Sequence, residues 1–191
     1  MNKFVNWHII KSIIFSAVIF SSIVAGANPV KSDVVSQENS LFEIKLKFAF
    51  VSKFIEYVDN DWLHAFEDNK IIIDVFGDIS PEEQVILQNF KQKKIKNFPL
   101  IVRINPKIRE LKNSDIIFVT KGAKFNISYL LKYSRDSVLT IGDNKYFIDQ
   151  GGIIEFYDYR GKIRFDIDEE KARKKGIFFN AKLLELSEVN R

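Results

Sequence analysis

The chain has 191 residues, of which 46% are hydrophobic and 28% charged, and its formal net charge at pH 7 is +4. This composition suits one globular domain and excludes collagen, low-complexity disorder and a protein with several membrane spans. The absence of cysteine excludes disulfides, thiolate nucleophiles, cysteine-ligated metal centres and a lipoprotein anchor. The two histidines, His8 and His64, leave little metal or catalytic chemistry to consider.

The N-terminal segment has the pattern of a secretory signal peptide. Lys3 and Lys11 are its only charges, and an apolar run covers residues 12–24. That run is short for a membrane-spanning helix, which needs about 20 apolar residues. Small residues at 25–27 match the positions that a signal peptidase recognises, so we expect a signal peptide with cleavage after Ala27. An uncleaved membrane anchor is the alternative. Cleavage removes two lysines and no acid, and the nearly neutral domain that remains is not expected to bind nucleic acid.

The next segment, 28–39, is polar and unpatterned, which predicts a flexible linker. Ser40 and Glu43 then form a capping-box pattern, and apolar residues at helical spacing predict a helix over 41–58. Strict alternation over 42–48 is also typical of a strand. The capping pattern decides for a helix.

Apolar runs and helix starts alternate through the middle of the chain. Strands are predicted at 71–76, 100–105, 115–120 and 138–142. Helical segments are predicted from Ser80 to about Phe90, in a short turn after Pro106, and from about Asn126 to Tyr133. Continuous apolar strands between helices indicate a parallel sheet that is covered on both faces.

The pattern changes after Gly151-Gly152. Strand-like runs at 153–159 and 162–167 flank Arg160-Gly161, which suits a tight antiparallel hairpin. A helix capped by Asp168 and ended by Gly176 should follow, and then a last helix over 180–188. We therefore expect residues 40–191 to form a single three-layer, Rossmann-like α/β domain. Its sheet should be mostly parallel, with an antiparallel C-terminal hairpin and terminal helices.

This C-terminal segment resembles the signature of the YfiR family. That signature has a GGM-type turn, a G-R-V-R-F-E-I-N strand, a helix containing Ala and Gly, and an S-S-x-L-L-x-L-A tail. Here the turn is GGI at 151–153 and the strand is GKIRFDID at 161–168, while VSKFIEY at 51–57 is similar to the family's F-A-K-F-V-E-W helix end. The matching motif residues are Gly151, Gly152, Gly161, Lys162, Arg164, Phe165, Asp166, Gly176, Leu183 and Leu184.

The departures from the signature are small. Lys162 replaces an arginine and loses its bidentate donation, and Asp166 replaces a glutamate. The resemblance implies a YfiR-like periplasmic regulator rather than an enzyme, without a cofactor. Its partner would be the periplasmic domain of an inner-membrane diguanylate cyclase, which it would repress in cyclic-di-GMP signalling. A small-ligand sensor module acting with a histidine kinase is the alternative, and an exported hydrolase is a more distant one. Whether the protein forms a homodimer is left open.

The residues themselves show no catalytic motif: there is no G-x-S-x-G elbow, no Walker loop and no G-x-G-x-x-G. We expect His64 to be structural, and Asp59, Asp61 and Asp68 to be solvated, because they lack EF-hand spacing. We therefore assign no catalytic, cofactor-binding or metal-binding residue.

The ends of the predicted parallel strands are more informative. Asp78, Lys121 and Asp143 should meet at one rim of the sheet, where open α/β sheets bind ligands. We hypothesise that Asp78 and Asp143 line a crevice there for a small ligand or a partner. The alternative is that Gly-Asp pairs simply end strands well.

Three other charged groups have two interpretations. Arg164 and Asp166 share one face of the hairpin, so they would either form a structural ion pair or meet a partner. Basic clusters at 91–96 and 171–175, the second of which includes Arg173, would contact an acidic partner or an anionic lipid, or would only be solvated.

Overall fold

The computed structural model describes residues 29–64 and 69–188. The predicted signal peptide, with its cleavage after Ala27, lies outside the described residues, and so does Asp68. The chain divides into two compact units, Met1–Gln37 and Glu38–Arg191. The sheet and the candidate site belong to the second unit. Among the described residues, no helix combines the length and apolar character needed to cross a membrane.

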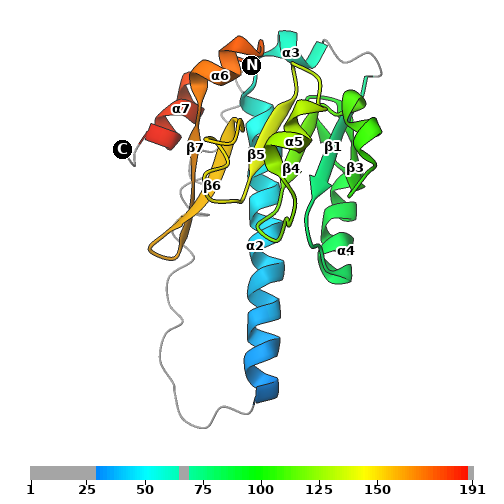
Figure 1. The fold of residues 1–191 in the computed structure, drawn as a ribbon, viewed down its shortest axis with the longest axis vertical. Coiled ribbons are helices and arrows are strands. Elements are labelled where there is room, and N and C mark those ends of the chain that lie inside the picture. Colours follow the sequence, from blue (N-terminus) through cyan, green and yellow to red (C-terminus); the bar gives the residue numbers. More distant parts are fainter. Residues whose placement is uncertain (1–28, 65–68, 189–191) are drawn as a thin grey trace, which may run out of the picture. The chain divides into compact units, whose positions relative to one another are not determined.

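A mixed seven-stranded sheet forms the centre of the second unit, with the strand order β2-β3-β1-β4-β5-β6-β7 (Figure 1). Pairing is parallel from β3 through β1, β4 and β5 to β6, and antiparallel at both edges, β2 with β3 and β6 with β7. The strands are β1 (Ile71–Phe76), β2 (Lys94–Ile95), β3 (Phe98–Ile104), β4 (Ile116–Val119), β5 (Leu139–Gly142), β6 (Ile154–Tyr159) and β7 (Lys162–Ile167). The predicted mostly parallel sheet with an antiparallel C-terminal hairpin is confirmed.

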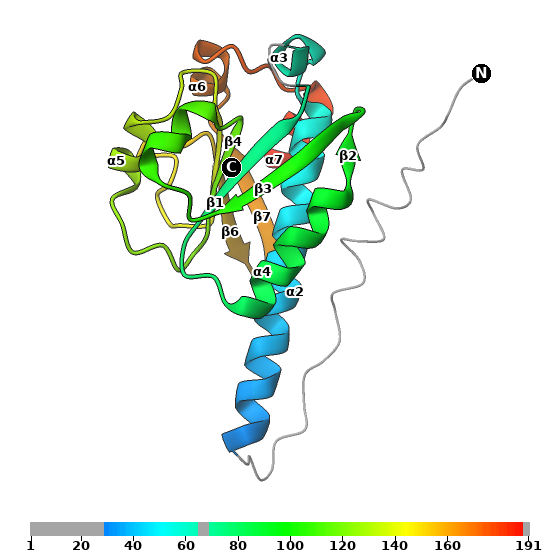
Figure 2. The ribbon, with the colours of Figure 1, turned by 90° about the vertical axis from the view of Figure 1, so that its right-hand side faces the viewer.

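Helices cover both faces of this sheet. They are α2 (Pro29–Tyr57), α3 (Asn60–His64), α4 (Pro81–Asn89), α5 (Ile127–Lys132), α6 (Glu169–Lys174) and α7 (Ala181–Glu188), with 3₁₀ turns η1 (Phe90–Gln92) and η2 (Ile108–Asn113). Figure 2 shows α5 on one side of the sheet and α4, with the later part of α2, on the other. The three-layer α/β class is therefore confirmed.

Alternating strand residues supply the two halves of the core. In β4, Phe118 belongs to the larger cluster, on the α2 side, and Ile117 belongs to the smaller one, with Leu130 of α5. Aromatic rings of α2 hold this helix to the sheet: Phe54 lies 4.8 Å from Phe165 of β7, measured between ring centroids. Burying rings of this size supplies much of the packing energy.

The start of α2 differs from the prediction. The helix begins at Pro29 rather than at Ser40, so the described part of the predicted linker, 29–39, is helical. Pro29 suits a first helical position, and no glycine or further proline interrupts the segment that follows. The predicted cap at Ser40 is wrong, because Ser40 lies inside the helix and its hydroxyl donates to Glu83 of α4.

Other local signals are confirmed. Ser80 and Glu83 form the predicted capping box at the start of α4, and the Asp168 side chain caps α6. Arg160 and Gly161 both have positive φ angles, as a tight hairpin turn requires. The short strand β2 was not predicted, because its lysines suggested a fraying helix end.

Candidate functional site

The order of the parallel strands reverses between β1 and β4. From β1 the chain crosses to β3 on one side, and it then returns to β4 on the other. In open α/β sheets, ligands bind beyond the carboxyl ends of the strands at such a switch point. Asp78 follows β1, Lys121 follows β4 and Asp143 follows β5. The three residues predicted to line a crevice therefore lie at this edge.

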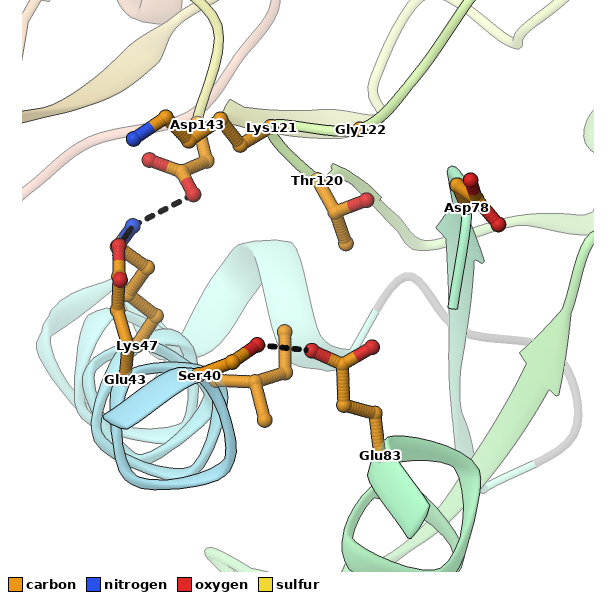
Figure 3. A pocket seen from close by; sticks show the side chains of 10 residues that line it. Ser40, Glu43, Lys47, Asp78, Glu83, Thr120, Lys121, Gly122 and Asp143 are labelled. Carbon is orange, nitrogen blue, oxygen red and sulfur yellow. Dashed lines mark hydrogen bonds and ion pairs between the residues drawn. The ribbon is translucent and has the colours of Figure 1, made fainter. Parts of the chain in front are cut away.

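A pocket of about 310 Å³ occupies this edge (Figure 3). All three predicted residues line it, so the structure does bring them together. Side chains of α2 and α4 complete the walls. The lining residues are Ser40, Glu43, Ile44, Lys47, Asp78, Glu83, Thr120, Lys121, Gly122 and Asp143.

Lys47 of α2 is the best-buried charged residue of the pocket, with only 5% of its side chain exposed. Its Nζ lies 2.5 Å from Asp143 Oδ2 and also donates to Glu43, one helical turn earlier. Burial raises the pKa of Asp143, and the hydrogen bond from Lys47 opposes that rise. The ion pair joins α2 to the residue that follows β5. Separating the pair would leave a buried charge without its partner, so the contact holds α2 to the end of β5.

A second polar contact joins the two helices that border the pocket. Ser40 Oγ of α2 donates to Glu83 Oε1 of α4 over 2.8 Å, as Figure 3 shows. The other oxygen of Glu83 accepts the backbone N–H of Ser80, which completes the capping box. One carboxylate therefore both caps α4 and bridges it to α2.

Close backbone approach shapes the floor between β1 and β4. A Cβ on Gly77 would lie 1.8 Å from Thr120 Oγ1, so only glycine fits there. Thr120 is buried, and its hydroxyl has no hydrogen-bond partner among the described residues. Gly122 lies similarly against Asp78, where a Cβ would come within 3.1 Å of the Asp78 Cβ.

The charges of the pocket suit binding through ionic and hydrogen-bonding contacts. Four carboxylates and two ammonium groups line it, and Lys47 is already paired. Asp78 is open to solvent, with 76% of its side chain exposed, and it forms a long 3.9 Å ion pair with Lys124. In the described part of the chain, no group of three or more histidine or acidic side chains is placed to hold a metal ion.

The family-motif residues lie elsewhere and build the C-terminal end of the domain. Gly152 lies against Phe147, since a Cβ there would come within 2.1 Å of the ring. Gly161 and Gly176 have positive φ angles, in the hairpin turn and after α6 respectively. Phe165 packs on α2, and Leu183 and Leu184 pack into the larger core cluster.

Of the charged positions of that motif, two are exposed and one is half-buried. Lys162 and Asp166 are exposed, and Arg164 is half-buried opposite Tyr157 of β6. The Arg164 Nε is buried and has no hydrogen-bond partner in the described structure. Pairing of Arg164 with Asp166 stays a prediction.

Members of the basic cluster at 171–175 form contacts within the domain. Lys171 donates to the carbonyls of Ile148 and Gly152, and Lys175 donates to that of Asp136. Neither of the two interpretations of that cluster, a partner or lipid contact and a merely solvated face, included these internal contacts. In the cluster at 91–96, Lys96 is similarly occupied by the carbonyl of Val58.

Sequence reasoning missed the α2 side of the pocket. Lys47 could have been found, because it lies one turn from Ile44 and Val51 on the buried face of the helix. A lysine there requires a buried acidic partner. Glu83 could not have been assigned to the pocket from the sequence, because the capping box with Ser80 already explains a glutamate at that position.

Fold and pocket together define a three-layer, Rossmann-like α/β domain with a polar pocket at its switch point. Residues 44–188 match the model of the YfiR/HmsC-like family, so the chain belongs to this family. It is a family of regulators in diguanylate cyclase signalling. A search of the curated proteins found no match.

Among solved structures, the chain is similar to a conserved domain protein from Vibrio cholerae O1 biovar El Tor str. N16961. The two share 14% sequence identity with a TM-score of 0.48. The match covers 76% of this chain and 59% of that one.

Proposed function

We propose that this protein is a periplasmic regulator that binds the extracytoplasmic domain of a membrane diguanylate cyclase and represses it. The observation that carries the proposal is the family match over residues 44–188, which includes every strand of the sheet. The signal-peptide pattern that ends at Ala27 supports delivery to the periplasm. The regulator would act by binding and would catalyse no reaction.

Repression of this kind is a shift of population. The regulator binds the inactive state of the cyclase more tightly than the active state, so the cyclase stays inactive until an envelope signal changes their affinity. The pocket at the switch point offers a place where such a signal could act, because α2 forms one of its walls through Lys47 and Ser40.

That same pocket supports the second candidate, a small-ligand sensor module that acts with a histidine kinase. Asp78 and Lys121 are exposed at its border and are available to a polar ligand. The two candidate functions differ in the membrane protein that is bound, and both place this protein in the periplasm.

Crosslinking in intact cells separates them. The full chain with a C-terminal tag is expressed in its source cell, the envelope is crosslinked, and the captured membrane protein is identified by mass spectrometry. We expect a protein with an extracytoplasmic domain and a cytoplasmic cyclase domain, and a rise in cyclic-di-GMP when the regulator gene is deleted. Capture of a kinase with unchanged cyclic-di-GMP supports the second candidate.

Two further measurements test export and the absence of catalysis. N-terminal sequencing of the protein purified from the periplasmic fraction should show a chain that begins at Asn28. Unprocessed protein in the cytosol, or rapid turnover of generic ester or phosphate substrates, contradicts the proposal.

A further inference from the structure

A groove separate from the switch-point pocket runs between α2 and α4. It has a volume of about 530 Å³ and is mainly apolar, with lysines as its only charged lining residues. We call it the α2–α4 groove. Its lining residues are Leu41, Phe42, Lys45, Ile86, Asn89, Phe90 and Lys93.

The two walls are single faces of their helices. From α2, Leu41 and Lys45 are one turn apart, and from the α4–η1 segment, Ile86 and Phe90 are one turn apart. Phe42 stands at the border with 61% of its surface exposed. Covering an exposed aromatic ring and an apolar groove removes apolar surface from water, which favours binding of a partner at this place.

The spacing of the walls is set by contacts on two sides. At the base, the Phe48 ring of α2 meets the Phe90 ring edge-on, with centroids 4.7 Å apart. Toward the switch point, Ser40 and Glu83 bridge the helices. The groove is thus held open by packed and hydrogen-bonded groups, so a partner finds a surface that is already formed.

The border of the groove is positively charged. Lys45 lies on the α2 side and Lys93 on the other, and neither forms an ion pair within the described part of the chain. The Lys93 ammonium lies 4.3 Å above the Phe90 ring, and Lys91 and Lys94 beside it are exposed. No carboxylate lines the groove.

We propose that the α2–α4 groove binds an acidic amphipathic segment of the partner protein. Apolar side chains of that segment enter the groove against Phe42, Ile86 and Phe90, and its carboxylates meet Lys45 and Lys93. This is helix-in-groove recognition with electrostatic selection. A flat lipid surface fits less well, because it cannot fill a concave groove. Identification of the partner as the cyclase rests on the proposed function, whereas the chemistry of the segment does not.

The first test uses the full exported chain and a synthetic probe. A labelled helical peptide with leucines at one face and glutamates at the other is titrated by fluorescence anisotropy, beside a peptide with lysine in place of glutamate. We expect the acidic peptide to bind, with an affinity that falls as salt rises, and the basic peptide to bind at least about tenfold more weakly. Equal binding of both peptides, or binding of neither, overturns the inference.

Variants place the binding in the groove. Phe42→Ser and the double variant Lys45→Glu/Lys93→Glu should each lower the affinity for the acidic peptide about tenfold or more. Val85→Ser is the matched apolar control, since Val85 is 62% exposed on α4 and does not line the groove. Lys132→Glu on α5 is the charge control. Thermal melts check that every variant folds, and equal loss in variants and controls contradicts a groove site.

A second test separates this inference from the proposed function. The extracytoplasmic domain of a captured cyclase is titrated with the same variants. If it binds native protein and groove variants equally, the groove inference fails while the proposed function stands. If no cyclase is captured, the proposed function fails and the peptide titration still decides the groove. Two results would show that the groove has another occupant and would overturn the inference. One is a dimer of the native protein that Phe42→Ser dissociates, and the other is binding to anionic vesicles that the groove variants abolish.

Discussion

Lys47 and Asp143 are 96 positions apart in the sequence and form an ion pair of 2.5 Å that joins α2 to the carboxyl end of β5. Both side chains are largely buried, with 5% and 12% exposed. The pair therefore connects a wall of the switch-point pocket to the sheet. Any ligand or partner that moves Lys47 also changes how α2 is held.

Removing Lys47 should be costly. Lys47→Met leaves Asp143 buried without its partner, and we expect the free energy of unfolding to fall by about 3 kcal/mol. The value is at the lower end for buried pairs because Asp143 is partly exposed and can take up a proton. Urea denaturation at pH 7 measures the loss. Lys53→Met is the matched control on the same helix, since the Lys53–Glu56 pair is exposed, and should cost less than about 1 kcal/mol. Equal losses would show that the buried pair does not hold α2.

Asp115 predicts a specific pH dependence of stability. Burial raises the pKa of Asp115 to about 6, although the Ile72 amide and Arg135 favour its charged form. Its pKa in an unfolded chain is about 3.9. Between these values the folded state holds a proton that the unfolded state has released, so stability falls as the pH rises from about 4 to 6. The contribution lost is at most about 3 kcal/mol.

A comparison of variants separates the contribution of Asp115 to the pH dependence of stability from the contributions of other acids, including Asp143. The difference in unfolding free energy between native protein and Asp115→Asn should shrink as the pH rises through the same window, since asparagine does not titrate there. A difference that stays constant with pH for Asp115→Asn would exclude Asp115 as the titrating group.

The motif glycine at 152 should have a packing role. A methyl group on Gly152 would overlap the Phe147 ring, so Gly152→Ala should destabilise the domain by about 2 kcal/mol or more. In the Phe147→Leu background the added cost of Gly152→Ala should be smaller, because the ring is gone. Thermal or urea unfolding measures this coupling. Gly161→Ala meets no neighbouring atom within 4 Å, so its cost comes from backbone strain at φ +72° and should not depend on Phe147.

The sequence predicts most of the sheet because its strands carry local signals. Runs rich in apolar β-branched residues, such as Ile71–Phe76, indicated buried strands, and Arg160-Gly161 indicated the hairpin turn. The rim residues Asp78, Lys121 and Asp143 followed from topology alone. Contacts between distant segments leave no such mark: Ser40 has the sequence pattern of a cap, and only tertiary packing assigns its hydroxyl to Glu83. The role of Phe147 likewise depends on Gly142 and Gly152 approaching it from two sides.

The dual use of Glu83 gives the last prediction. Ser40→Ala removes only the bridge between α2 and α4, and should cost about 0.5–1 kcal/mol. Glu83→Ala removes the bridge and also weakens the capping box, so about 1.5–2 kcal/mol is expected. In the Glu83→Ala background, Ser40→Ala should then have almost no further effect, whereas Ser80→Ala should still cost part of its capping energy. Urea unfolding of these variants forms a double-mutant cycle. Additive losses for Ser40 and Glu83 would show that the two residues act independently and that the bridge does not position α4.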